Sequence, residues 1–134
     1  MVYVTGDTHG MIDFEKMLTF AEKHPALTKK DYVIVAGDFG GVWMKKYLAE
    51  DLKRYEDLPF TVLFVDGNHE NFDLLYSYPV EVWKGGKIHR VSLHVFAFDA
   101  RAGIYDRGQN LFYLWRGNEY RQMLPYRRGK LVAA

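Results

Sequence analysis

The chain has 134 residues, a length typical of one domain, and its 49% hydrophobic and 26% charged residues exclude wholesale disorder. The formal net charge of +1 gives no support to nucleic-acid binding, and the absence of cysteine excludes disulfides, thiolate metal sites and cysteine nucleophiles. No apolar run is long enough to span a membrane and no signal-peptide pattern is present, so we expect no membrane association and a cytoplasmic location.

Short apolar runs alternate with amphipathic stretches over the first 80 residues. In the first amphipathic stretch, Phe14, Leu18 and Ala21 fall on one helical face, and Pro25 prevents the helix from continuing. Nearly continuous apolar strands separated by helices are typical of a parallel sheet buried on both faces. The sequence therefore predicts an α/β fold, with strands at residues 2–4, 32–36 and 62–65 and helices at 11–24, 44–57 and 70–77.

From residue 80 onward the pattern changes to short strands and turns. Because no linker or low-complexity segment separates the two regions, we expect a single domain over residues 1–134. Its parts are a motif-bearing region at 1–79, a strand-rich region at 80–115 and a basic tail at 116–134, which we interpret as a solvated segment. The strands predicted in the second region lie at 80–83, 88–91, 95–98, 103–105 and 111–115, with a turn at Gly85-Gly86.

Each of the three predicted parallel strands is followed by a glycine and then by a side chain that can bind a metal through oxygen. These side chains are Asp7, Asp38 and Asn68, and His9 and His69 lie within two residues of the first and the last. Because the carboxyl ends of parallel strands meet at one edge of a sheet, we expect all five residues to converge there. Carboxylate, amide oxygen and imidazole are ligands suited to Mn²⁺, Fe or Zn²⁺, and Mg²⁺ can also use such a set.

Three segments in this order resemble the first three motifs of the calcineurin-like metallophosphoesterases: Gly-Asp-Thr-His-Gly at 6–10, Gly-Asp-Phe-Gly-Gly at 37–41 and Gly-Asn-His-Glu at 67–70. The resemblance implies mixed β-sheets flanked by helices in an αββα sandwich. It also implies a metal-dependent hydrolase that cleaves phosphate mono- or diesters through attack of a metal-activated water at a dinuclear site. The expected partner is a small phosphoester or a nucleotide.

The resemblance further implies a role for each matching residue. Asp7 and His9 would hold the first metal ion, Asp38 would bridge both ions, and Asn68 would bind the second. His69 would contact the phosphate and protonate the leaving oxygen as the catalytic acid. The implied cofactors are two divalent metal ions, with manganese expected first and iron, zinc or magnesium as alternatives.

Two features depart from the family pattern. The later histidine motifs have no counterpart, since the remaining histidines, His24, His89 and His94, do not match them. The fold is therefore expected to be truncated and incomplete at its C-terminal end, with an under-coordinated second ion and exposed sheet edges that favour self-association. The protein phosphatases of this superfamily carry an arginine directly after the second motif, where it grips the phosphate. This chain has no arginine at that place, which argues against a protein phosphatase. Trp43, just past this motif, is interpreted as a core residue at the start of the second helix, with ring stacking at the mouth of the site as the alternative.

Two other functions stay open at this point. One is a non-catalytic metal-binding remnant that acts as a binding or regulatory module, which the missing histidines favour. The other is a nuclease-type phosphodiesterase, which the basic tail permits and a strong salt dependence of DNA binding would support.

Overall fold

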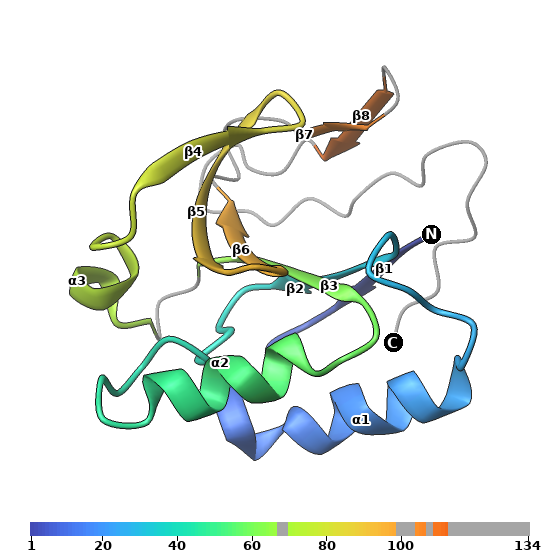
Figure 1. The fold of residues 1–134 in the computed structure, drawn as a ribbon, viewed down its shortest axis with the longest axis horizontal. Coiled ribbons are helices and arrows are strands. Elements are labelled where there is room, and N and C mark those ends of the chain that lie inside the picture. The colour runs from blue at the N-terminus through green and yellow to red at the C-terminus, as the bar shows by residue number, and fades with distance from the viewer. Residues whose placement is uncertain (67–69, 99–103, 107–108, 113–134) are drawn as a thin grey trace.

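The computed structural model describes residues 1–66, 70–98, 104–106 and 109–112 (Figure 1). Its strands are β1 (Val2–Thr5), β2 (Tyr32–Ala36), β3 (Thr61–Val65), β4 (Val80–Trp83), β5 (Gly86–Ser92), β6 (Val95–Phe98), β7 (Ile104–Asp106) and β8 (Gln109–Phe112). Its helices are α1 (Phe14–Lys23), α2 (Leu48–Glu56) and α3 (Phe72–Leu75), with a 3-10 turn η1 (Gly10–Ile12) before α1. Strands β1 to β6 form one mixed sheet in the order β1-β2-β3-β6-β5-β4, and β7 and β8 form a separate hairpin.

The first three strands lie side by side and run parallel, as the sequence predicts. Ile34 of β2 is paired with Val4 of β1 on one side and with Leu63 of β3 on the other. Strand β6 joins β3 in parallel, and the β4–β5 hairpin then continues the sheet with antiparallel pairing. The α/β class and the mixed sheet flanked by helices are therefore confirmed.

Helices α1 and α2 cover one face of the sheet (Figure 1). Val33 and Val35 of β2 pack toward these helices, while Ile34 belongs to a second cluster with Leu63 and Phe96. This alternation is the period-2 pattern of a strand, and here both faces are apolar because both are buried. The pairing of β1, β2 and β3 brings their C-terminal ends to one edge of the sheet.

All three predicted helices are shorter in the structure than in the prediction. The first is preceded by η1, and the second begins at Leu48 because residues 44–47 form a tight turn, closed by a hydrogen bond from the Tyr47 amide to the Met44 carbonyl at 3.0 Å. The third is a single turn capped by the Asn71 side chain, which accepts a hydrogen bond from the Leu74 amide at 3.1 Å.

The bounds of the strands after residue 80 agree with the predicted bounds within a few residues, except at the last predicted strand. The predicted strand at 111–115 corresponds to β8, which begins earlier, and residues 113–115 lie outside the described part of the chain. The basic tail at 116–134 lies outside it too, so the division into regions and the C-terminal incompleteness stay predictions. No helix in the described segments combines the length and the apolar character that crossing a membrane requires.

Candidate metal centre

The loops that follow β1 and β2 are joined by backbone hydrogen bonds. The amides of Thr8 and His9 both donate to the Asp38 carbonyl, at 3.2 and 3.0 Å, and the Gly10 amide donates to the Phe39 carbonyl at 2.7 Å. The Thr8 hydroxyl adds a bond to the same Phe39 carbonyl at 3.1 Å. The first and second motifs, about 30 residues apart in sequence, therefore form one continuous backbone structure.

Two glycines make this close approach of the loops feasible. A Cβ atom on Gly10 would lie 2.7 Å from the Gly40 carbonyl oxygen, and one on Gly40 would lie 2.7 Å from the Gly10 nitrogen. Both residues also have positive φ angles, +62° and +66°, a conformation that side chains disfavour. Gly10, the last residue of the first motif, and Gly40, within the second motif, are thus required where the two backbones meet.

The third motif is attached to the second through Glu70. Its side chain is buried, and its carboxylate accepts a hydrogen bond from the Phe39 amide at 2.6 Å and further bonds from the Gly40 amide at 3.3 Å. A carboxylate that accepts backbone N–H bonds forms strong, charge-assisted contacts. Glu70 therefore fixes the loop that carries Asp38. No role was predicted for Glu70 from the sequence, although its place in the third motif was a usable signal.

Three residues that the sequence analysis placed at a metal site come together at this edge. One potential ligand atom each from Asp7, His9 and Asp38 lies within 4.8 Å of the other two. Asp38 is buried, whereas Asp7 and His9 are exposed, so the group is open to solvent on one side. Two carboxylates and an imidazole fit a divalent cation, and two carboxylates held this close repel each other unless a cation or proton compensates.

The backbone is strained at two of these three residues. His9 has a φ of 45° and Asp38 a φ of 35°, both in the left-handed region that residues other than glycine seldom adopt. Such strain costs on the order of 1–3 kcal/mol per residue and persists only where the surrounding structure imposes it. Here the hydrogen bonds between the loops and to Glu70 impose it.

Asn68 and His69 lie outside the described residues, so their predicted convergence with the other three stays a prediction. Strand β3, which leads to them, is paired with β2 as far as Val65 beside Ala36.

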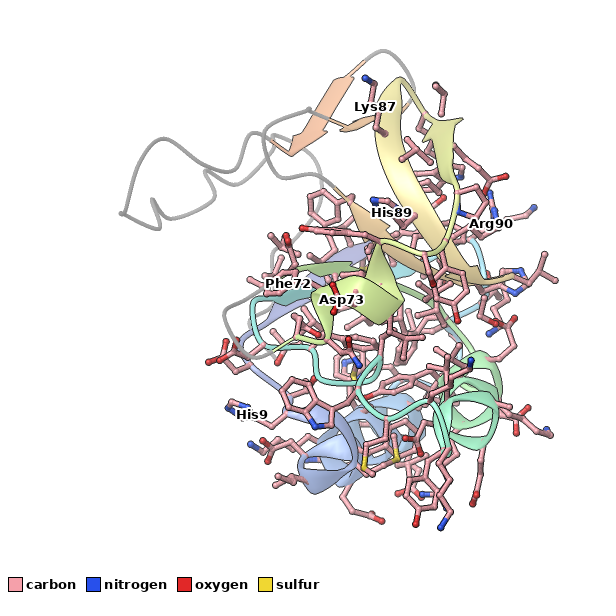
Figure 2. All side chains as sticks on the ribbon, turned by 90° about the vertical axis from the view of Figure 1, so that its left-hand side faces the viewer. His9, Phe72, Asp73, Lys87, His89 and Arg90 are labelled. Carbon is pink, nitrogen blue, oxygen red and sulfur yellow. The ribbon has the colours of Figure 1, made fainter. Side chains whose placement is uncertain are left out.

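The other described histidines are engaged elsewhere. His24 Nδ1 is 2.9 Å from the Phe20 carbonyl oxygen at the end of α1, and His89 Nδ1 is 2.8 Å from the Tyr78 carbonyl oxygen. His94 is paired with Glu56. Figure 2 shows His89 on β5, well separated from His9. None of the three belongs to the Asp7–His9–Asp38 group.

Aromatic rings of the core pack against the loop that follows β2. Phe39 stacks on Phe64 of β3 with the ring centroids 4.0 Å apart, and Tyr55 of α2 lies against Phe39 at 4.7 Å and against Phe14 at 5.0 Å. The Tyr55 hydroxyl is buried without a hydrogen-bond partner among the described residues, and burial raises the pKa of this phenol above its usual value. The loop that carries Asp38 is therefore packed on buried aromatic side chains through Phe39.

Trp43 is not a core residue, contrary to the preferred interpretation of the sequence. Its side chain is 49% exposed, because the chain does not enter α2 until Leu48 and leaves Trp43 on the preceding loop. There it lines an open cleft next to His9.

The chain matches the family model described as calcineurin-like phosphoesterase over residues 1–131, and it therefore belongs to this family of metal-dependent phosphoesterases. Searches of curated proteins and of solved structures gave no match.

Proposed function

We propose that the protein hydrolyses phosphate mono- or diesters at the edge of the sheet where β1, β2 and β3 end, with two divalent metal ions as cofactors and manganese as the preferred metal. The observation that carries this proposal is the grouping of Asp7, His9 and Asp38, whose potential ligand atoms lie within 4.8 Å of one another. Membership in the calcineurin-like phosphoesterase family supports the same chemistry.

The family resemblance implies how these residues would share two metal ions. Asp7 and His9 would hold the first ion, Asp38 would contact both ions, and Asn68 would hold the second. The bound ions would neutralise the phosphate charge and lower the pKa of a water into the range of a nucleophile. The buried position of Asp38, fixed through its own backbone carbonyl and through Glu70 beneath the loop, suits a carboxylate that must keep one geometry between two ions.

His69 is proposed as the general acid, which would donate its proton to the leaving oxygen of the ester. Its support is its place in the third motif, directly before Glu70, whose carboxylate is anchored to the second loop. A small phosphoester or a nucleotide is preferred as substrate over a phosphoprotein, because the protein phosphatases of this superfamily grip phosphate with an arginine after the second motif and this chain has no arginine there.

The test measures hydrolysis of bis-(p-nitrophenyl) phosphate and p-nitrophenyl phosphate with and without Mn²⁺, together with Mn²⁺ affinity by calorimetry. Asp38→Asn should abolish turnover and weaken Mn²⁺ binding. The matched control is Asp57→Asn, which makes the same chemical change at an exposed carboxylate at the end of α2 and should alter neither. Mn²⁺ binding without turnover would favour a non-catalytic metal-binding module, and absence of Mn²⁺ binding would contradict the proposal.

A further inference from the structure

An open cleft of about 420 Å³ adjoins the candidate metal centre, and His9 is common to both. Its walls come from the 3-10 turn after β1, from the loop after β2 and from the beginning of α2. In Figure 2 the His9 side chain projects outward from the loop between β1 and α1. A molecule bound at the metal centre would therefore have the cleft beside it.

The lining of this cleft is apolar and aromatic, and the described lining contains no lysine or arginine. Ile12, Trp43, Met44 and Tyr47 all contribute to it, although they are 82%, 49%, 51% and 44% exposed. Exposed apolar side chains gathered at a cleft mark a binding site, since isolated ones are ordinary but a cluster is not. Two cations lie behind the lining, Lys46 Nζ at 5.2 Å from the Tyr47 ring centroid and Arg54 Nη1 at 3.3 Å from Met11 Sδ, but neither residue lines the cleft, whose own surface suits an uncharged group.

The backbone of Trp43 is held in place by hydrogen bonds, although its ring is exposed. The Asn71 side-chain amide donates a hydrogen bond to the Trp43 carbonyl at 2.7 Å, which ties this loop to the residue that caps α3. The turn between Met44 and Tyr47 closes the loop on the other side. Because the backbone that carries the indole is already held, less loop entropy is lost when a ring stacks on Trp43.

One carboxylate, Asp51 in the first turn of α2, belongs to the lining. It is half-buried and accepts hydrogen bonds only, so it selects for a ligand that presents an N–H or O–H group at this end of the cleft. A carboxylate beside an aromatic wall is a combination that favours a nucleobase over a purely hydrocarbon ring.

We propose that this cleft binds the aromatic group of the phosphoester substrate, a nucleobase bearing an N–H donor, with Trp43 stacked on the ring and Asp51 accepting the hydrogen bond. The assignment rests on the proposed function, because it takes the phosphate to lie at the Asp7–His9–Asp38 group. His9 forms the wall between the two subsites.

Binding is measured first, without metal or chemistry. Dissociation constants of adenosine, purine riboside and ribose are determined by calorimetry in the presence of EDTA. Adenosine should bind and ribose should not, and Trp43→Ala should weaken adenosine binding by roughly five- to a hundredfold, the range for a lost stacking contact. Asp51→Ala should weaken adenosine binding but leave purine riboside unchanged, because purine riboside lacks the amino group. Val82→Ala, at an exposed apolar residue on β4, is the control.

Hydrolysis then separates this inference from the proposed function. With Mn²⁺, the rate ratio of phenyl phosphate to glycerol 2-phosphate should fall in Trp43→Ala and stay unchanged in Val82→Ala. Turnover with an unchanged ratio, or adenosine binding that Trp43→Ala does not weaken, would overturn the cleft assignment alone. Trp43-dependent adenosine binding without turnover of any phosphoester would support the ring site and overturn the proposed hydrolysis.

Discussion

The carboxylate of Glu70 accepts a hydrogen bond from the amide of Phe39 at 2.6 Å, across 31 positions of sequence. This contact joins the last residue of the third motif to the backbone beside Asp38. The second and third motifs are therefore connected by a hydrogen bond between a side chain and the main chain, as well as through any ion that they bind.

Glu70→Gln tests this connection. The substituted amide keeps one acceptor oxygen but loses the charge and turns an NH₂ group toward backbone donors, so we expect a loss of about 1–3 kcal/mol in the free energy of unfolding. Mn²⁺ affinity should fall as well, because Asp38 loses its support. Urea unfolding and calorimetry measure the two effects. Glu50→Gln, on the exposed face of α2, should change stability by no more than about 0.5 kcal/mol. Unchanged Mn²⁺ affinity in Glu70→Gln would show that the loop holds its shape without the carboxylate.

Gly10→Ala should destabilise the protein strongly. The new methyl group would meet the Gly40 carbonyl oxygen at 2.7 Å, and the positive φ adds strain, so we expect a loss of at least about 2 kcal/mol. Gly6→Ala is the matched control in the same motif, because a Cβ there meets nothing within 4 Å. Thermal unfolding compares the two variants. Equal melting temperatures would mean that the loops can separate at little cost.

Tyr55→Phe should leave stability unchanged or raise it by up to about 1 kcal/mol. The hydroxyl is fully buried and has no partner among the residues that the structure describes, so its removal relieves a desolvation cost while the ring contacts with Phe39 remain. Chemical denaturation at neutral pH measures the difference. A loss above about 1 kcal/mol would reveal a hydrogen bond that this hydroxyl makes in solution.

Glu56 should make the protein sensitive to acid. Burial on its own would raise the pKa of this carboxyl, but hydrogen bonds from His94 and Ser92 outweigh it and lower the pKa. A lowered pKa contributes stability that is present above the unfolded value of about 4.3 and is lost as the pH falls through the folded value. Wild type should therefore exceed Glu56→Gln in urea midpoint at pH 7, and the gap should close toward pH 3. A gap that is constant with pH would show that the carboxylate charge does not matter.

The sequence predicted the parts of the structure that depend on strand order. The convergence of Asp7, His9 and Asp38 could be predicted because the carboxyl ends of successive parallel strands lie at the same edge of the sheet. Their distances could not be predicted, since these depend on left-handed residues and on glycines in close backbone contact. The exposure of Trp43 was missed because helical periodicity in the second amphipathic stretch does not show where the helix starts.

Glu70 and Asp51 escaped the sequence analysis for a different reason. The Glu70 carboxylate acts through hydrogen bonds to a distant loop, and Asp51 lines a cleft between a helix and two loops, and neither arrangement leaves a periodic pattern in the sequence. A buried carboxylate has the same letter as a solvated one, so the motif could mark Glu70 as a candidate but could not show that its carboxylate accepts hydrogen bonds from Phe39 and Gly40.

Because of the strand order, the strands that lead to the metal centre should differ in how easily they open locally, with β3 inside the sheet and β1 at its edge. Strand β3 is buried along its whole length and is paired with β2 and β6, so we expect its amide protons to exchange with solvent only when the whole domain unfolds. Among the described strands, β1, which leads to Asp7 and His9, lies at the edge of the six-stranded sheet and pairs with β2 only. Fraying of β1 would loosen the chain that leads to those two ligands, so the hydrogen bonds from Thr8, His9 and Gly10 to the second loop are what would keep a bound ion from leaving before the fold opens.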